Sequence, residues 1–295
     1  MAASIVPEIG ARLTSVAMFG VLAALVSYIA YRRRFFQLPF ALTNSLTYIR
    51  LPIVGFIGYL FVSLFSTPAI LLLLFYFFAD LKDYFLRLPL LMIAVGQTFT
   101  LCITTVFLLL FAFLQKKVVI KEIIFGPEKP AFRSQLSHCG MGMVAWLVSF
   151  PIAGCLYELT NLLTHFLFGV FAAEQRVVIL LQRLAQSPGL LAIMLIAILI
   201  GAPIIEEFFF RGILQNYLKC KMRFTWALIL SSLIFSLLHL SPGDGWSNLP
   251  TASALFTFAL YLGFIYERQR SLLAPIALHM TFNSINVMRI LLTAV

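Results

Sequence analysis

A succession of long apolar segments limits the folds that are open to this chain. Eight runs are about as long as the roughly 20 apolar residues that a helix needs to cross a bilayer. They lie at about 13–31, 51–79, 88–115, 141–173, 184–206, 224–240, 245–266 and 271–292. Because a backbone in lipid must satisfy its own hydrogen bonds, such runs favour α-helices. We therefore predict an all-α fold, a polytopic membrane helix bundle of about eight transmembrane helices.

The composition excludes soluble and secreted classes of protein. Charged residues make up only 11% of the 295 residues, and mean hydropathy is +1.01, whereas a soluble domain carries about 25% charged residues. Four cysteines are too few for a disulfide scaffold, and we expect free thiols. The run at 51–79 contains Pro52 and Pro68, so a single span and a broken one both remain open.

The basic residues alternate between the loops. One set of loops holds 14 of them: Arg32, Arg33, Arg34, Arg50, Lys116, Lys117, Lys121, Lys129, Arg133, Lys219, Lys221, Arg223, Arg268 and Arg270. The opposite set holds five: Arg12, Lys82, Arg87, Arg176 and Arg183. The positive-inside rule places the basic set in the cytosol and both termini outside. The net charge of +10 thus reflects membrane topology, and we expect no nucleic-acid partner. Short loops favour a multi-pass protein of a prokaryotic plasma (inner) membrane.

Ionisable residues inside the spans are concentrated in the second half. The first four spans contain only Glu158 and His165, whereas the last four contain Glu206, Glu207, Arg211, His239, His279 and Arg289. A charge at the bilayer centre costs about 2.5–3.5 kcal/mol on insertion scales, so such residues are functional candidates. A polar loop at 116–140 lies between the third and fourth spans.

Helix register predicts that several of these groups meet. Glu206 lies 15 residues before Lys221 and His239 lies 18 after it. If a turn near Lys221 joins two antiparallel helices, the mismatch of three residues is about 4.5 Å in depth. His279 and Asn283 are four residues apart and share one face of the last helix.

This set of side chains suits peptide hydrolysis. A carboxylate beside an imidazole, such as Glu206 with His239, can activate a water molecule. Glu207 has Arg211 four residues later, which favours its ionised form, so the two carboxylates have different tasks. His279 and Asn283 can donate hydrogen bonds to an oxyanion. Pro203 is expected to free the Leu199 carbonyl and to kink the helix beside Glu206.

A metal is the competing use of the same atoms. Glu206, His239 and His279 match the ligand types of some zinc sites, although the chain has no H-E-x-x-H motif. The cofactor is therefore open: none is required, or a divalent metal such as zinc. No intramembrane aspartate accompanies the histidines, so a Ser–His–Asp arrangement is not evident.

Other residues have structural interpretations. Glu158 and His165, seven apart, are expected to form a structural pair or to line a cavity, and Arg289 to reach the interface or to pair with Glu158. Lipid contact or packing is expected for four phenylalanines: Phe208, Phe209, Phe210 and Phe235.

The charged motifs resemble those of a known family. Glu206-Glu207-x-x-x-Arg211, Phe235-x-x-x-His239 and His279-x-x-x-Asn283 resemble, in order, the motifs of the CAAX protease and bacteriocin-processing (CPBP or Abi) family, which includes type II CAAX prenyl endopeptidases. The resemblance covers about residues 188–295. It implies that the chain divides into N-terminal transmembrane scaffold helices, 1–187, and a CPBP-like catalytic core, 188–295. It implies that Glu206 and His239 activate water, that Glu207 and Arg211 support them, and that His279 and Asn283 stabilise the oxyanion.

We therefore expect an intramembrane endopeptidase, of glutamate type or metal-dependent. Its partners would be the bilayer and a membrane-anchored or prenylated peptide or protein substrate, as in CAAX-box protein processing. The alternative is a membrane transporter, or a scaffold without catalysis, whose buried charges line a polar pathway. Transporters often show repeats in both halves, whereas here the buried charge is confined to one half.

The charge asymmetry generates a topology prediction. Single cysteines introduced into 116–140 should resist a membrane-impermeant thiol reagent in intact cells and should react after permeabilisation. Labelling of this segment from outside intact cells would contradict the predicted topology and indicate the opposite orientation.

Overall fold

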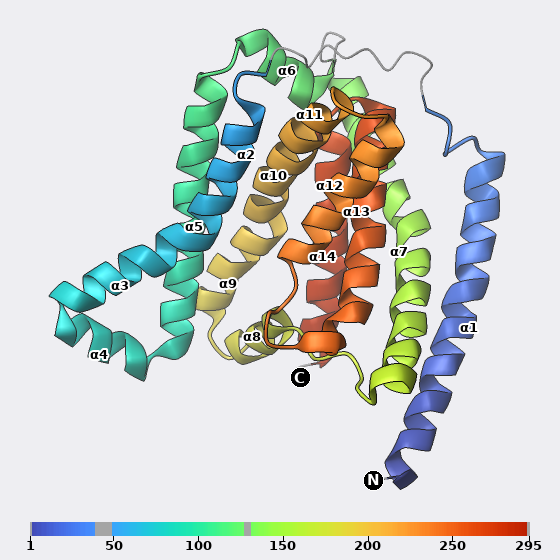
Figure 1. The fold of residues 1–295 in the computed structure, drawn as a ribbon, viewed down its shortest axis with the longest axis horizontal. Helices are drawn as coiled ribbons and strands as arrows, with labels where there is room; N and C mark the ends of the chain where they lie inside the picture. The colour runs from blue at the N-terminus through green and yellow to red at the C-terminus, as the bar shows by residue number, and fades with distance from the viewer. Residues whose placement is uncertain (1, 39–48, 127–130, 294–295) are drawn as a thin grey trace.

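The computed structural model describes residues 2–38, 49–126 and 131–293, and within these ranges the chain is helical without β-strands (Figure 1). The first half contains α1 Ala2–Arg32, α2 Pro52–Phe61, the π-helical η2 Val62–Ser66, α3 Thr67–Phe77, α4 Ala79–Arg87, α5 Pro89–Phe113, α6 Lys117–Phe125 and α7 Phe132–Phe168. The second half contains α8 Arg176–Leu184, α9 Pro188–Ile196, the π-helical η3 Ala197–Gly201, α10 Ala202–Glu207, the π-helical η4 Phe208–Gln215, α11 Asn216–Lys219, α12 Phe224–Leu238, the 3₁₀-helical η5 Gly245–Asn248, α13 Leu249–Gln269 and α14 Leu273–Thr293.

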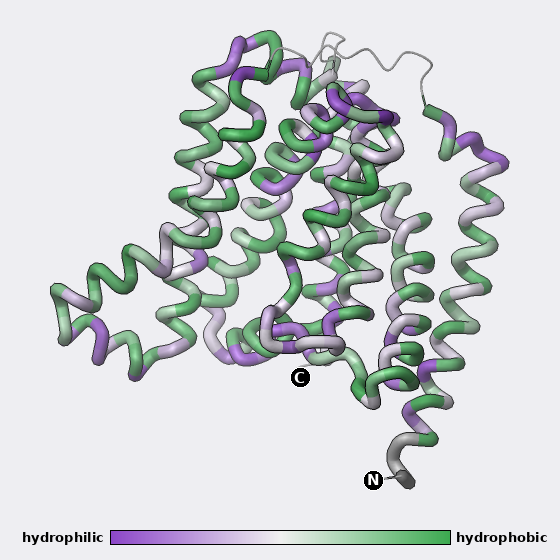
Figure 2. The backbone as a smooth tube through the Cα atoms, viewed as in Figure 1, coloured by the Kyte–Doolittle hydropathy of each residue, from purple (hydrophilic) through white to green (hydrophobic). Residues whose placement is uncertain are grey.

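The eight apolar runs all form helices, which confirms the polytopic all-α prediction. In the part of the chain that the structure describes, six helices are long and apolar enough to span a membrane: Val6–Arg32, Pro52–Phe77, Pro89–Phe113, Phe132–Phe168, Pro188–Lys219 and Gly245–Gln269. The other two runs correspond to the shorter apolar α12 and to α14. Figure 2 shows hydrophobic residues along the middle of the bundle and hydrophilic residues gathered toward its two ends. The chain is an integral membrane protein that crosses the bilayer several times.

The basic segments gather at one end of the bundle. The end of α1, α6, α11 and the end of α13 lie at this end, whereas the start of α1 and the end of α14 lie at the opposite one (Figure 1). Of the 14 basic residues on the predicted cytosolic side, Lys129 lies outside the described residues. The arrangement agrees with the alternation of charge along the chain and with termini on a common side.

Residues 116–140 are not the loop that we expected. They contain α6 and the first two turns of α7, which are separated at Gly126 by a positive φ of 89°. Pro127 and Pro130 fall between the two helices and outside the described residues. Helix α7 begins at the basic end with Phe132 and continues for 37 residues, through Pro151 in its interior.

The 51–79 run is one helical path with a change of direction. The π-helical turn η2 lies between α2 and α3, and Figure 1 shows α3 bending away from the bundle to meet α4. A π turn is a usual cause of such bends. The first helix also begins earlier than predicted, because residues before 13 extend it to Ala2.

The predicted association of Glu158 with His165 is wrong. Glu158 Oε2 accepts a hydrogen bond at 3.1 Å from Nη1 of Arg12, which lies in α1 and not in a loop. His165 stacks on Phe171, with ring centroids 4.0 Å apart. Arg289 is exposed and is not the partner of Glu158. The acid therefore joins α1 to α7, the helix that α1 contacts.

Helix α7 supports the last two helices by close packing. It contacts both α13 and α14. At Gly142 the backbones approach so closely that an added Cβ would overlap the Ala274 carbonyl oxygen and lie 2.9 Å from the Leu278 nitrogen. Small residues commonly permit such approaches between membrane helices. This contact fixes the start of α14, the helix that carries His279.

The α7–α14 contact generates a stability prediction. Gly142→Ala should destabilise the protein by about 1–3 kcal/mol, because backbone atoms must move to admit the methyl group. Gly140→Ala is the matched control, since Gly140 is two residues away in the same helix and has nothing within 4 Å of an added Cβ. Thermal unfolding in detergent should show a lower midpoint for Gly142→Ala alone. Equal midpoints would contradict the close approach.

Candidate active site

Pro203 and a π turn shape the helix that carries the glutamates. The Ala202 N–H bonds the Ala197 carbonyl, five residues earlier, so the next bond in this register would join residue 203 to Ile198. Proline has no N–H, which leaves the Ile198 carbonyl without that partner. Asn283 Nδ2 donates to this oxygen at 2.8 Å. The structure thus shows a side-chain donor on the Ile198 carbonyl, which was not predicted because the prediction assumed an α-helical turn and the turn is π-helical.

The predicted hairpin brings His239 to Glu206. Helix α11 ends at Lys219 and α12 begins at Phe224, so the turn falls near Lys221 as expected. His239 directly follows α12, and its Nδ1 lies 2.7 Å from the Phe235 carbonyl oxygen. A carbonyl only accepts, so Nδ1 carries the proton that it donates. The other ring nitrogen, Nε2, lies 3.6 Å from Glu206 Oε2.

Glu207 is the centre of a buried charge network. Arg211 Nη1 donates to Glu207 Oε1 at 3.1 Å, and the two side chains are 2% and 0% exposed. His279 Nδ1 lies 2.8 Å from the same oxygen. Arg211 Nη2 also donates to the Ala259 carbonyl, and the guanidinium carbon lies 4.6 Å from the centre of the Phe235 ring. The predicted Glu207–Arg211 pair is therefore present, and it joins α10, η4, α13 and α14.

Glu206 has a more open environment than its neighbour. Its side chain is 18% exposed, and Nε2 atoms of His239 and His279 lie 3.6 and 3.9 Å from Oε2. Among the described residues, Oε2 has no hydrogen-bond partner within 3.5 Å. In a neutral His239, Nε2 presents a lone pair to the Glu206 carboxylate, so the two groups are both acceptors and a water molecule between them could donate a hydrogen bond to each. Glu206 is thus the carboxyl group with capacity to bind a further polar molecule.

The phenylalanines around the motifs pack inside the protein. Phe208, Phe209, Phe210 and Phe235 are all buried, so packing, and not lipid contact, is their role. Phe209 stacks on Tyr59 of α2, with ring centroids 4.4 Å apart and planes 7° apart. Tyr59 was not predicted as a site residue from the sequence. A tyrosine with its hydroxyl group in an apolar span is common in membrane proteins and does not by itself indicate a site.

The geometry of the three predicted metal ligands does not fit a metal ion. Among the described residues, no group of three or more His, Cys, Asp or Glu side chains is arranged to hold one. Glu206, His239 and His279 do converge, but His279 uses Nδ1 to bond Glu207 and its Nε2 is 3.9 Å from Glu206. No step in the mechanism below is therefore assigned to a metal.

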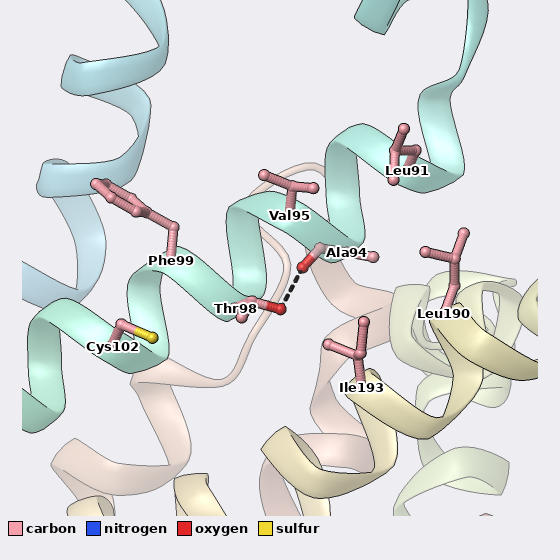
Figure 3. A pocket seen from close by; sticks show the side chains of 8 residues that line it. All are labelled: Leu91, Ala94, Val95, Thr98, Phe99, Cys102, Leu190 and Ile193. Atoms are coloured by element: carbon pink, nitrogen blue, oxygen red, sulfur yellow. Dashed lines mark hydrogen bonds between the residues drawn. The ribbon is translucent and has the colours of Figure 1, made fainter.

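A pocket of about 310 Å³ lies away from this cluster, between α5 and α9 (Figure 3). Its lining is almost entirely apolar: Leu91, Ala94, Val95, Thr98, Phe99, Cys102, Leu190 and Ile193. The Thr98 hydroxyl donates to the Ala94 carbonyl at 2.8 Å within its own helix. This pocket holds none of the predicted site residues and offers no acid–base pair.

The charge network generates a second stability prediction. Glu207→Gln leaves Arg211 without its carboxylate in a fully buried position and should destabilise the protein by about 3 kcal/mol. Glu206→Gln is the matched control one residue away, since no arginine pairs with it, and it should leave the thermal midpoint nearly unchanged. Similar midpoints for the two variants in detergent would show that the pair does not stabilise the fold.

Comparison with known proteins relates the second half of the chain to membrane peptidases. Residues 188–285 match the family described as type II CAAX prenyl endopeptidase Rce1-like. An "Uncharacterized 24.3 kDa protein" of Escherichia coli is 30% identical over 157 residues, which cover 48% of this chain and 70% of that protein. The "Putative membrane peptidase YdiL" of Bacillus subtilis (strain 168) is 27% identical over 187 residues, which cover 63% and 67%.

No solved structure matches the chain. The matched residues 188–285 contain all three motifs noted in the sequence, from Glu206 to Asn283. The family match thus confirms the resemblance expected from those motifs. This chain belongs to the Rce1-like family of type II CAAX prenyl endopeptidases.

Proposed function

We propose that the protein is an intramembrane endopeptidase in which Glu206 and His239 activate the hydrolytic water. The observation that carries this proposal is the position of Glu206 Oε2, which lies within 4 Å of two imidazole nitrogens and has no hydrogen-bond partner of its own. A water molecule bound there would meet a proton acceptor and would be held inside an apolar bundle.

The reaction follows from the roles of these groups. Glu206, as a carboxylate, accepts a proton as the water oxygen attacks the scissile carbonyl carbon, and the Nε2 lone pair of neutral His239 accepts a hydrogen bond from the same water molecule. The tetrahedral intermediate carries a negative oxygen, for which His279 Nε2, when protonated, and the second N–H of Asn283 are the available motif donors. The C–N bond then breaks, and the proton returns to the leaving amine. Glu207 and Arg211 hold His279 in place.

The substrate proposed is a peptide bond in a membrane-anchored protein, of the prenylated type that the family name describes. The catalytic core would be residues 188–295, and residues 1–187 would act as scaffold, with α7 packed against α13 and α14. A prokaryotic plasma membrane fits the two bacterial relatives. Membrane anchoring fits a site inside a bundle with an apolar surface, since Ile204 and Leu237 are exposed on α10 and α12, the helices that position Glu206 and His239.

A transporter remains the second candidate, because buried charges also line solute pathways. The main argument against it is that Glu207 and Arg211 are bonded to each other and to neighbouring helices, and so are unavailable to a moving solute. Proteoliposomes separate the two functions. Cleavage of a lipid-anchored peptide without solute flux supports the protease, and flux without cleavage would overturn it.

Glu206→Gln should abolish cleavage while the protein stays folded. The amide cannot accept the water's proton, so we expect kcat to fall by at least about 100-fold, the lower part of the range for loss of a general base. The assay uses proteoliposomes and a set of quenched fluorescent peptides on lipid anchors, including a farnesylated cysteine followed by three residues.

Thermal unfolding of the same preparations serves as the folding control. Near-normal turnover by folded Glu206→Gln, together with a folded but inactive Glu207→Gln, would reverse the roles of the two glutamates. Activity in both variants would refute the glutamate mechanism.

A further inference from the structure

Tyr59 is a buried polar group beside the glutamates that the mechanism above does not use. Its side chain is 8% exposed. The ring lies in an aromatic layer, stacked on Phe209 and in edge contact with Phe210, with centroids 4.4 and 6.3 Å apart. These two phenylalanines lie two and three residues after Glu207, so their contacts place the Tyr59 ring beside the helical segment that follows the glutamates. Helix α2, which carries Tyr59, contacts η4.

The rotation of α2 is fixed by its contacts with α5. A Cβ at Gly58 would lie 2.6 Å from the Phe107 ring, and one at Gly55 would overlap the Phe111 ring. Close packing on this face leaves Tyr59 little freedom to turn away from η4. The orientation of the phenol is therefore a property of the packed bundle and not of a flexible side chain.

The hydroxyl of Tyr59 lacks a partner where a buried phenol usually has one. In the ranges that the structure describes, this hydroxyl makes no hydrogen bond. It interacts electrostatically with Glu206, Glu207 and Arg211. The Oε2 atoms of both glutamates are also without hydrogen-bond partners. The Tyr59 hydroxyl and the two Oε2 atoms are thus three oxygen atoms without hydrogen-bond partners among the described residues, and a polar molecule bound near them would supply partners.

The two predicted oxyanion donors are partly occupied. His279 donates Nδ1–H to Glu207, which in the neutral ring leaves a lone pair and not a proton on Nε2. Asn283 uses one N–H for the Ile198 carbonyl. A charge that develops on the scissile carbonyl oxygen therefore needs a further donor, and Tyr59 has a free O–H.

We propose that the Tyr59 hydroxyl donates a hydrogen bond to the scissile carbonyl oxygen in the transition state. Tyr59 would then be a catalytic residue supplied by the N-terminal half, outside the matched residues 188–285. The proton stays on the phenol throughout, so no bond of Tyr59 is made or broken. This inference rests on the proposed endopeptidase function.

Tyr59→Phe tests the role, because it removes the hydroxyl and keeps the ring stacked on Phe209. On the peptide that wild type cleaves fastest in the proteoliposome set, we expect kcat to fall about 10- to 100-fold, with KM within about twofold, as for loss of a transition-state hydrogen bond. The thermal midpoint should not change. Tyr261→Phe, which removes the hydroxyl of a partly buried tyrosine in α13, should keep full kcat.

The outcomes separate the two proposals. Full kcat in Tyr59→Phe, while Glu206→Gln is inactive, overturns the Tyr59 role alone. If Tyr59→Phe loses activity because its thermal midpoint is lower, or because its KM is raised while kcat is unchanged, the role of Tyr59 is structural. Either result also overturns the proposed catalytic role of Tyr59. An active Glu206→Gln, or a wild type that cleaves no peptide of the set, overturns the endopeptidase proposal itself.

Discussion

The buried ion pair of Glu207 and Arg211 is the interaction on which the arrangement of the helices from α10 to α14 depends. Both side chains are almost fully removed from solvent, and burying two charges costs several kcal/mol each unless further hydrogen bonds satisfy them. The satisfying groups come from other elements: the Ala259 carbonyl of α13, the Phe235 ring of α12 and the imidazole of His279 in α14. A shift of any of these helices would leave a charged atom unpaired in an apolar interior.

The same network explains why two adjacent glutamates differ. Glu207 points into the bundle, where arginine and histidine share one of its oxygens. Glu206 is next in the helix but is turned by about 100° around its axis, toward His239 and the more exposed side. The Glu207 carboxylate is therefore fixed by its hydrogen bonds, whereas Glu206 has an oxygen atom, Oε2, without a hydrogen-bond partner among the described residues. In a membrane-embedded protease of this family, that division supplies both a stable frame and a place for water.

The sequence predicts the spans and most of the site because these depend on local periodicity and on one short turn. The turn near Lys221 places Glu206 and His239 at the same level along the bundle to within a few ångströms. This placement does not depend on how the neighbouring helices are packed. Partners between remote helices were not predictable, since they depend on how each helix is rotated. Arg12 meets Glu158 across 146 residues, and Tyr59 meets Phe209 across 150. The start of α7 was also mistaken for a loop, because polar residues at a helix end look like a loop when only hydropathy is considered.

Two of the motif side chains also hydrogen-bond backbone carbonyls where a membrane helix is irregular. In hydrocarbon no water replaces a lost backbone bond, so every carbonyl freed by a π turn or a helix end needs a side chain. Asn283 satisfies the Ile198 carbonyl beside Pro203, and His239 satisfies the Phe235 carbonyl at the end of α12. Each therefore has its orientation set by the backbone before any substrate binds. A site whose polar side chains also complete the hydrogen bonding of its helices is preorganised, because moving a side chain out of position would leave a buried carbonyl without a partner.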